Sequence, residues 1–205
     1  MRVKRLAVFV SGGGSNMQAI MDAIARGEIC GEICLVISSR ADAYALVRAQ
    51  NSAIETYVLD KGMSREMQDE KILSLLKEQR IDYCILAGYL SIVSPKMIAE
   101  YRNRIVNIHP SLIPSFCGKG YYGHHVHQAV LDYGAKISGC TVHFVDEGTD
   151  TGAIILQQAV PVEQDDTADT LAARILVQEH LMIVRAVRLL CEERLSVEGR
   201  RVRIL

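Results

Sequence analysis

The sequence has little of what marks a membrane, secreted or nucleic-acid-binding protein. Its 205 residues carry 23 Lys and Arg against 24 Asp and Glu, so a net charge of −1 offers no general attraction to nucleic acid or anionic membrane. No stretch approaches the roughly 18 consecutive apolar residues of a membrane span. The apolar run Leu6–Val10 is too short for a signal peptide. We expect a soluble, cytoplasmic protein without nucleic-acid or membrane partners.

The cysteines and histidines lack the spacing of a metal site. The six cysteines form no CxxC pair, and no second pair or nearby histidine completes a site around Cys30 and Cys34. His124, His125 and His127 stand close together, but no cysteine or carboxylate lies beside them. We expect free thiols in a reducing compartment, polar residues at a helix start, and no metal requirement.

Short apolar runs alternate with helical patterns along the chain. Hydrophobic residues make up 49% and charged residues 23% of the sequence, which are ordinary globular values. The alternation predicts a single α/β domain with buried parallel strands. The strands are expected over 6–10, 35–37, 56–59, 82–87, 105–108, 137–145 and 153–160, with a hairpin over 195–204. Helices are expected from Met17, over 41–50 and 64–77, after Pro95, around 126–131 and from Thr167.

A glycine-rich turn follows the first expected strand. Ser11-Gly12-Gly13-Gly14-Ser15-Asn16 lies between that strand and a helix, where backbone N–H groups and the helix dipole favour an anion. We favour a phosphate site over a plain tight turn. A dinucleotide fingerprint would need Gly where Met17 stands, and no Gly-Lys-Ser/Thr closes a P-loop. The loop therefore suits a phosphomonoester better than NAD or ATP.

Polar side chains gather where the strand 105–108 ends. Pro110 stops the strand ladder, so Asn107 and His109, two residues apart, point to one face. An amide donor beside a titratable imidazole suits a carbonyl that becomes an oxyanion. The alternative, that both side chains only satisfy loop backbone, stays open. The acidic turn Asp146–Gly152 reads as a plain turn, or as the source of a carboxylate that orients the imidazole.

Two of the expected helices each carry a charged residue at a notable position. Ser64 is suited to cap a helix whose first turn holds Arg65, and position alone predicts a solvated Arg65. Glu179 lies inside the apolar last helix and needs an edge position or a partner. The expected inner face of the helix that Ser64 caps consists of Met67, Ile72, Leu75 and Leu76. That of the last helix consists of Leu171, Ile175, Leu181, Val184 and Val187.

Three motifs together resemble a known family. Ser11-Gly-Gly-Gly-Ser-Asn16, the run Asn107-Ile-His-Pro-Ser-Leu-Ile-Pro114 and the run from Val142 to Gly152 are similar to those of the folate-dependent formyltransferases. The glycine loop and Gln178-Glu179-His180 narrow the resemblance to the phosphoribosylglycinamide (GAR) formyltransferases, from Arg2 to about Leu195. The resemblance implies a Rossmann-like fold of this family, with a mostly parallel twisted sheet, helices on both faces and antiparallel strands at the C-terminal edge.

The resemblance also implies an activity and its residues. Formyl transfer from 10-formyltetrahydrofolate to the amine of GAR, a step of purine synthesis, would use Asn107, His109 and Asp150 as the catalytic set. GAR would contact Gly14, Ser15, Asn16, Leu176, Val177, Gln178 and Glu179. Folate would contact Arg65, Leu90, Ser91, Ile92, Val93, Asn107, Asp146, Glu147, Gly148, Thr149 and Asp150. This reverses the position-only interpretation of Arg65, whose charge would meet the glutamate tail.

The implied organisation is one domain over residues 1–205. About 1–105 would form the phosphate-binding half and about 106–205 the catalytic and folate-binding half. Ser91 departs from relatives that carry Arg, which leaves the folate contacts there open. The segment 116–123 is longer than in shorter members, with Cys117 at a place often held by Pro, and predicts a different mouth to the cleft with the same chemistry.

Three competing functions are separable. Methionyl-tRNA formyltransferase resembles a longer chain with a basic RNA-binding domain, and formyltetrahydrofolate deformylase carries an added N-terminal regulatory domain. A non-catalytic nucleotide-binding module would explain the glycine loop but leave Asn107, His109 and Asp150 without a role. We expect small-molecule substrates and a monomer or homodimer.

Overall fold

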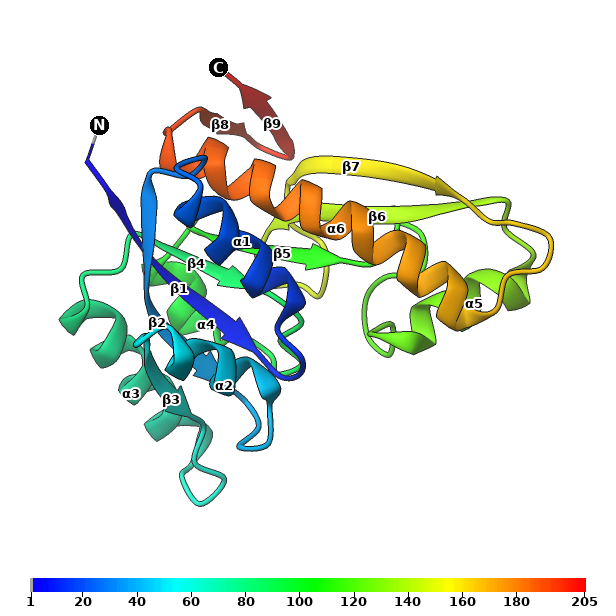
Figure 1. Ribbon diagram of the computed structural model, residues 1–205. Helices are drawn as coiled ribbons and strands as arrows, with labels where there is room; N and C mark the ends of the chain where they lie inside the picture. The colour runs from blue at the N-terminus through cyan, green and yellow to red at the C-terminus, as the bar shows by residue number, and fades with distance from the viewer. Residues whose placement is uncertain (1) are drawn as a thin grey trace.

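The computed structural model describes residues 2–205 and places the apolar runs in one nine-stranded sheet. Six helices flank it in two layers (Figure 1). The strands are β1 (Lys4–Val10), β2 (Gly31–Ser38), β3 (Glu55–Val58), β4 (Tyr83–Leu86), β5 (Ile105–His109), β6 (Ile137–Phe144), β7 (Ile154–Pro161), β8 (Leu195–Glu198) and β9 (Arg201–Ile204). The helices are α1 (Ser15–Ala25), α2 (Tyr44–Asn51), α3 (Arg65–Glu78), α4 (Pro95–Glu100), α5 (His124–Tyr133) and α6 (Ala168–Cys191).

The sheet is parallel in its first half and changes character at β5. The strand order is β3-β2-β1-β4-β5-β6-β7-β9-β8, with β1 to β5 parallel. β6 pairs antiparallel with β5 and with β7, and the hairpin β8–β9 joins the edge through a parallel contact with β7. The predicted single α/β domain, with antiparallel strands toward the C-terminal edge, is confirmed. None of the helices within residues 2–205 is long and apolar enough to cross a membrane.

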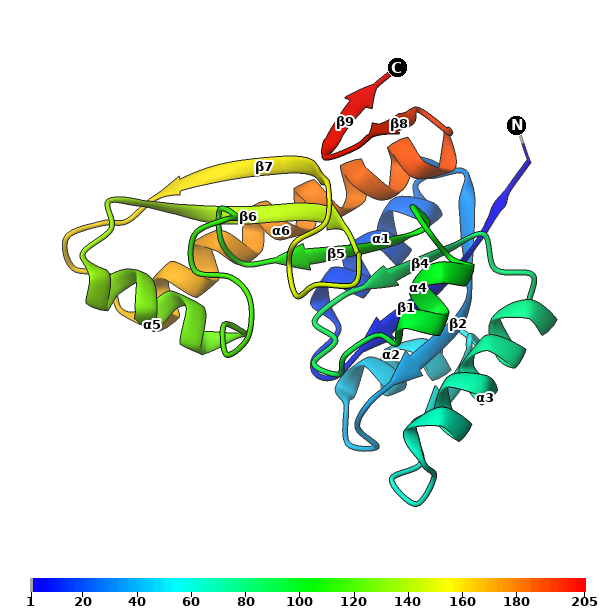
Figure 2. The same ribbon diagram turned by 180° about the vertical axis from the view of Figure 1, so that it is seen from behind.

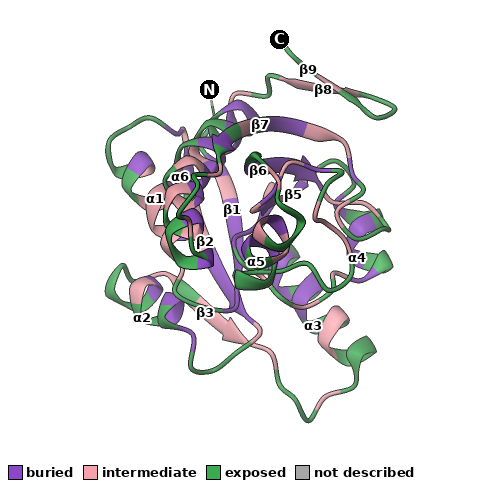
Figure 3. Ribbon diagram, turned by 90° about the vertical axis from the view of Figure 1, so that its right-hand side faces the viewer, coloured by how far each residue is buried: buried purple, intermediate pink, exposed green. Residues whose placement is uncertain are grey.

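Strand alternation divides the core between the two faces of the sheet. In β1, Leu6, Val8 and Val10 face the cluster covered by α1, α2, α5 and α6. Ala7 and Phe9 face the smaller cluster under α3 and α4, seen in front in Figure 2. Figure 3 shows the central strands as the buried part of the molecule. Each fully buried aliphatic or aromatic side chain contributes about 1.5–3 kcal/mol, so β1 is firmly held between both layers.

Helix starts agree with the expected caps. The Ser64 hydroxyl accepts a hydrogen bond from the Met67 N–H at 3.2 Å, and Ser94 does the same for Met97 ahead of Pro95. Thr167 and Thr170 form a capping box for α6. α2 begins at Tyr44, later than the predicted start at residue 41.

Two inner-face assignments were wrong. Met67 is 55% exposed because it lies in the first turn of α3, ahead of the buried positions Ile72, Leu73, Leu75 and Leu76 of that helix. Leu181 is 56% exposed because Glu179 occupies the inward position of α6. Two residues correspond to about 200° around a helix, which turns Leu181 to the opposite side.

Candidate active site

The glycine loop joins β1 to α1 at the carboxyl end of the parallel strands. Gly14 is the N-cap of α1 in the left-handed conformation, with φ of 73°, and no side chain caps the helix. The first-turn N–H groups of α1 are therefore open to an anion. Before the loop, the Ser11 hydroxyl lies 2.5 Å from that of Ser39 and accepts a hydrogen bond from the Leu90 N–H. These contacts tie the loop to β2 and to the segment after β4.

Asn16 and Glu179 meet beneath the loop from opposite ends of the sequence. The Asn16 Nδ2 donates to Glu179 Oε2 at 2.8 Å, and both residues are buried. Glu179 thus has the partner that its place in an apolar helix requires. Burial raises the pKa of Glu179, and the Asn16 hydrogen bond partly opposes that rise. The buried Oδ1 of Asn16 has no partner among the described residues, so it remains available to a hydroxyl or amine donor.

The sequence-predicted residues 176–178 lie on the same helix as Glu179. Leu176 and Gln178 are half-buried, and Val177 is 58% exposed. The structure therefore brings Gly14, Ser15, Asn16 and Glu179 to one end of α1, with the outer surface of α6 beside them (Figure 1).

Asn107 and His109 occupy the end of β5 as predicted. Antiparallel pairing places Asn107 opposite His143 of β6, and His109 opposite Thr141. The Asn107 Nδ2 lies 3.2 Å from His143 Nε2. His143 Nδ1 lies 2.7 Å from the Phe144 carbonyl, which can only accept, so Nδ1 carries the proton and Nε2 accepts from Asn107. One N–H of the Asn107 amide is thereby fixed, and the second remains free for a substrate oxygen.

The ring of His109 is oriented by backbone. His109 Nε2 lies 2.9 Å from the Phe116 carbonyl oxygen, so Nε2 carries a proton and the neutral ring has its lone pair on Nδ1. Nδ1 lies 3.6 Å from Asp150 Oδ2. His109 is 4% exposed, and burial lowers its pKa, although the Phe116 hydrogen bond and the Asp150 charge act in the other direction. The neutral, basic form is favoured near pH 7.

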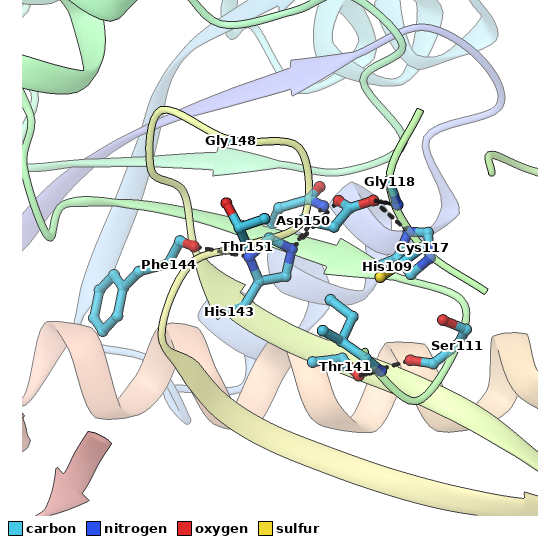
Figure 4. A network of polar contacts seen from close by, with 12 residues as sticks. His109, Ser111, Cys117, Gly118, Thr141, His143, Phe144, Gly148, Asp150 and Thr151 are labelled. Carbon is cyan, nitrogen blue, oxygen red and sulfur yellow. Dashed lines mark hydrogen bonds and ion pairs between the residues drawn. The ribbon is translucent and has the colours of Figure 1, made fainter. Parts of the chain in front are cut away.

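Asp150 lies between the rings of His109 and His143 (Figure 4). Its backbone is left-handed, with φ of 58°, in the turn between β6 and β7. Oδ2 accepts from the Gly118 N–H at 2.9 Å, and Oδ1 is 3.7 Å from His143 Nε2. Burial alone would raise the pKa of Asp150, but the hydrogen bond and positive charge that His143 and His109 supply when protonated, together with the Gly118 N–H, bring the pKa below its usual value. The carboxylate is ionised at neutral pH.

This arrangement prepares a place for a proton donor. His109 Nδ1 and Asp150 Oδ2 are both acceptors, and their separation of 3.6 Å exceeds a direct hydrogen bond. An amine or water placed between them could donate to either atom. The free N–H of Asn107 can meanwhile polarise a carbonyl. Chemically, the site can withdraw a proton from a nucleophile and stabilise a developing oxyanion.

The turn Asp146–Gly152 presents Asp150 through its own internal contacts. Asp146 Oδ1 accepts from the Gly148 N–H at 3.2 Å and from the Thr151 hydroxyl at 2.5 Å. Glu147 pairs with Arg102 on the surface. A Cβ on Gly152 would lie 1.8 Å from the Phe144 carbonyl, so close approach of backbone requires glycine there.

A separate cavity of about 280 Å³ lies beside α3. Arg65 borders it together with the sequence-predicted Ser91, Ile92 and Val93, while Phe9, Ile72 and Met97 supply apolar wall. Leu90 is 57% exposed and lies outside the lining, as do Asn107 and the turn 146–150. The predicted folate residues thus fall into two groups, one around this cavity and one around His109.

Sequence reasoning missed three contributors to the site. His143 lies within the strand expected over 137–145, and the sequence predicted no role for it. Only the antiparallel register of β6 against β5 shows that it faces Asn107. Phe116 and Gly118 act through a backbone carbonyl and N–H, for which no side-chain pattern exists. The helix-start histidines give no metal centre, since no group of three or more potential ligands forms within residues 2–205. His124 instead pairs with Asp169, and burial lowers the pKa of His127 to about 4.

The chain is similar in sequence to known proteins. A phosphoribosylglycinamide formyltransferase of Haemophilus influenzae is 38% identical over 198 residues, covering 96% of this chain and 91% of its own length. The chloroplastic enzyme of Vigna unguiculata is 42% identical over 196 residues and covers 95% of this chain. This chain spans 63% of that plant protein, less than two thirds of its length.

Solved structures agree. The crystal structure of glycinamide ribonucleotide transformylase 1 from Symbiobacterium toebii superimposes with a TM-score of 0.93 at 44% identity, covering 99% of this chain and 94% of the other. The formyl transferase family matches residues 4–187, which include β1, the glycine loop, Asn107, His109, Asp150 and most of α6. The chain therefore belongs to the formyl transferase family.

Proposed function

We propose that this protein transfers the formyl group of 10-formyltetrahydrofolate to the amine of GAR, giving formyl-GAR and tetrahydrofolate. The observation that carries this proposal is the grouping of Asn107, His109 and Asp150 at the end of β5. The phosphoribosylglycinamide formyltransferases that match nearly the whole chain support the choice of substrates. We further propose a cytoplasmic location, a role in purine synthesis, and action as a monomer or homodimer.

GAR would bind across the N-terminal half, about residues 1–105, and the last helix. Its phosphate would accept hydrogen bonds from the loop at Gly14, Ser15 and Asn16. Glu179 would accept from the ribose hydroxyls, beside Leu176, Val177 and Gln178. The open N–H groups of α1 support the placement of the phosphate, and the unpartnered Oδ1 of Asn16, an acceptor, supports a ribose hydroxyl beside it.

The folate would run from the reacting centre toward the cavity beside α3. Its glutamate carboxylate would meet Arg65, and its ring system would pass Leu90, Ser91, Ile92 and Val93. The turn residues Asp146, Glu147, Gly148 and Thr149 would border the other end, next to Asp150. This assigns residues 106–205 to catalysis, with folate contacts from both halves.

The reaction then follows from the positions of protons. The GAR amine attacks the formyl carbon, and a C–N bond forms while the free N–H of Asn107 stabilises the oxyanion. The Nδ1 of His109 would take one proton from the attacking nitrogen, with the carboxylate of Asp150 beside it. His109, now charged, delivers a proton from Nδ1 to the folate nitrogen as the bond between that nitrogen and the formyl carbon breaks. The charge on Asp150 stabilises the imidazolium in between.

A spectrophotometric assay of 10-formyltetrahydrofolate consumption tests the proposal. Consumption that requires GAR, with formyl-GAR as product, is the expected result. Consumption without an acceptor would indicate hydrolysis, and consumption only with methionyl-tRNA would indicate the tRNA formyltransferase; either result would overturn the assignment. No consumption with any acceptor would return the chain to a nucleotide-binding role.

A further inference from the structure

α2 contacts the glycine loop on the side opposite the open N–H groups of the loop. The Ala45 N–H donates to the Gly12 carbonyl at 3.1 Å, and the Arg48 Nε donates to the Gly13 carbonyl at 2.9 Å. A Cβ on Gly14 would lie 2.6 Å from the Ala45 Cβ and 3.6 Å from the Arg48 Cδ. The backbone of the glycine loop therefore packs against side chains of α2, and the carbonyl groups of Gly12 and Gly13 point toward that helix.

Those two contacts determine where the loop N–H groups point. In a planar trans peptide the N–H lies opposite the C=O. With the Gly12 and Gly13 carbonyls turned to α2, the N–H groups of Gly13 and Gly14 turn away from it. Neither N–H donates to any acceptor within residues 2–205. They continue into the free first-turn N–H groups of α1 and form one donor array with them.

Contacts with α1 and with Tyr44 hold the Arg48 guanidinium in place. Its Nη1 donates to Gln18 Oε1 on α1 at 3.0 Å, and its guanidinium carbon lies 5.0 Å from the centre of the Tyr44 ring. Arg48 takes part in none of the ion pairs formed among residues 2–205. A cation without a carboxylate partner therefore lies behind a loop whose open backbone groups are N–H donors, which suits a doubly charged ligand.

We propose that Arg48 is a positioning residue for the phosphate of GAR. It holds the Gly13 carbonyl so that the N–H groups of Gly13 and Gly14 face the phosphate, and its charge adds to the attraction. The choice of GAR as ligand rests on the proposed function. The orientation of the donor array does not, because it follows from the contacts of α2 with the loop.

The test compares substrates with and without phosphate. Arg48→Ala should weaken GAR binding roughly 10- to 100-fold, the range for loss of a charge-assisted hydrogen bond. The KM for GAR should rise by that factor while kcat and the KM for 10-formyltetrahydrofolate change little. With the dephosphorylated glycinamide ribonucleoside, wild type and variant should have equal kcat/KM. Arg48→Lys, which keeps the charge and one donor, should recover part of the loss.

Arg26→Ala is the matched control, since it removes the same charge at the other end of α1, where Arg26 pairs with Glu28. It should leave both substrates unaffected. An equal loss for the phosphorylated and dephosphorylated substrates, or an equal effect of Arg26→Ala, would overturn the proposal.

Titration with ribose 5-phosphate by calorimetry separates this proposal from formyl transfer. Wild-type binding that Arg48→Ala weakens, with ribose alone not bound, supports the array even in a protein that transfers no formyl group. Unchanged affinity in Arg48→Ala, or no binding of ribose 5-phosphate to the wild type at millimolar concentration, would overturn it. Thermal unfolding of each variant confirms that the compared proteins are folded.

Discussion

The two halves of the sheet prepare their parts of the site by different means. In the parallel half, the groups on the open face of the glycine loop, where we propose that the phosphate binds, are backbone N–H groups, and the side chain of Arg48 contacts the loop from behind. In the antiparallel half the roles are exchanged. There the side chains of His109 and Asp150 face the proposed reacting centre, and the backbone of Phe116 and Gly118 holds them.

The exchange follows from what each half has to do. A phosphate needs several donors at fixed positions and no change of protonation, which backbone at a helix start supplies. Proton transfer needs groups that titrate, and only side chains do so. Side-chain substitution should therefore affect rate in the antiparallel half and affinity in the parallel half.

The largest effect is expected at His109 and Asp150. We predict that His109→Ala or Asp150→Asn lowers kcat by about 10²–10³-fold or more while GAR binding persists, because the proton acceptor of the reacting amine is lost. Steady-state kinetics together with calorimetric GAR binding measure both quantities. His124→Ala removes an exposed imidazole, paired with Asp169, and serves as control. Near wild-type rates in both variants would contradict the catalytic assignment.

Asn16 should show the opposite pattern. Asn16→Ala removes a predicted phosphate contact and leaves the buried Glu179 without its partner. We expect the KM for GAR to rise about tenfold or more, with a much smaller change in kcat. Ser15→Ala should move the KM in the same direction without disturbing Glu179. A loss confined to kcat in either variant would remove the contrast between the halves.

Gly152 tests how strictly the antiparallel half must hold Asp150. An added Cβ would overlap the Phe144 carbonyl, which also accepts from His143 Nδ1. We predict that Gly152→Ala lowers the free energy of unfolding by about 1–3 kcal/mol and reduces kcat. Gly13→Ala is the comparison, because a Cβ there meets nothing within 4 Å. Denaturant titration of both variants gives the free energies, and equal stability of the two would contradict the prediction.

The smallest effect concerns pH. The folded pKa of His109 lies below its ordinary value of 6.5, because burial disfavours the imidazolium. The neutral, basic ring is therefore present above that lowered pKa and is lost as pH falls through it. We predict that kcat, measured with saturating GAR, is level near neutrality and falls only below pH 6.5. An acid limb of kcat centred above that value in wild-type protein would show that His109 is not the titrating base.

The sequence predicted some of these features and missed others, and the difference has a physical reason. Apolar runs and caps such as Ser64 and Thr167 act locally, and most of the strands and helices followed from them. Asn107, His109 and the glycine loop could be predicted as candidate site residues from their residue types. His143 required the register of β6 against β5, and the carbonyl of Phe116 required the path of a loop; both depend on tertiary structure. The prediction that Leu181 lies on the inner face of α6 was wrong because the buried carboxylate of Glu179 takes that position.

The hydrogen bond between Asn16 and Glu179 spans 163 positions of sequence. A ribosome makes α1 well before α6, so the elements from β2 to β7 are synthesised before the two halves of this contact coexist. The strands β1 to β5 all precede α6 in the chain and pair with one another without it. The proposed nucleotide pocket, by contrast, stays incomplete until α6 packs beside α1. A nascent chain would therefore lack the buried partner of Asn16 until α6 has been made and has packed against the sheet.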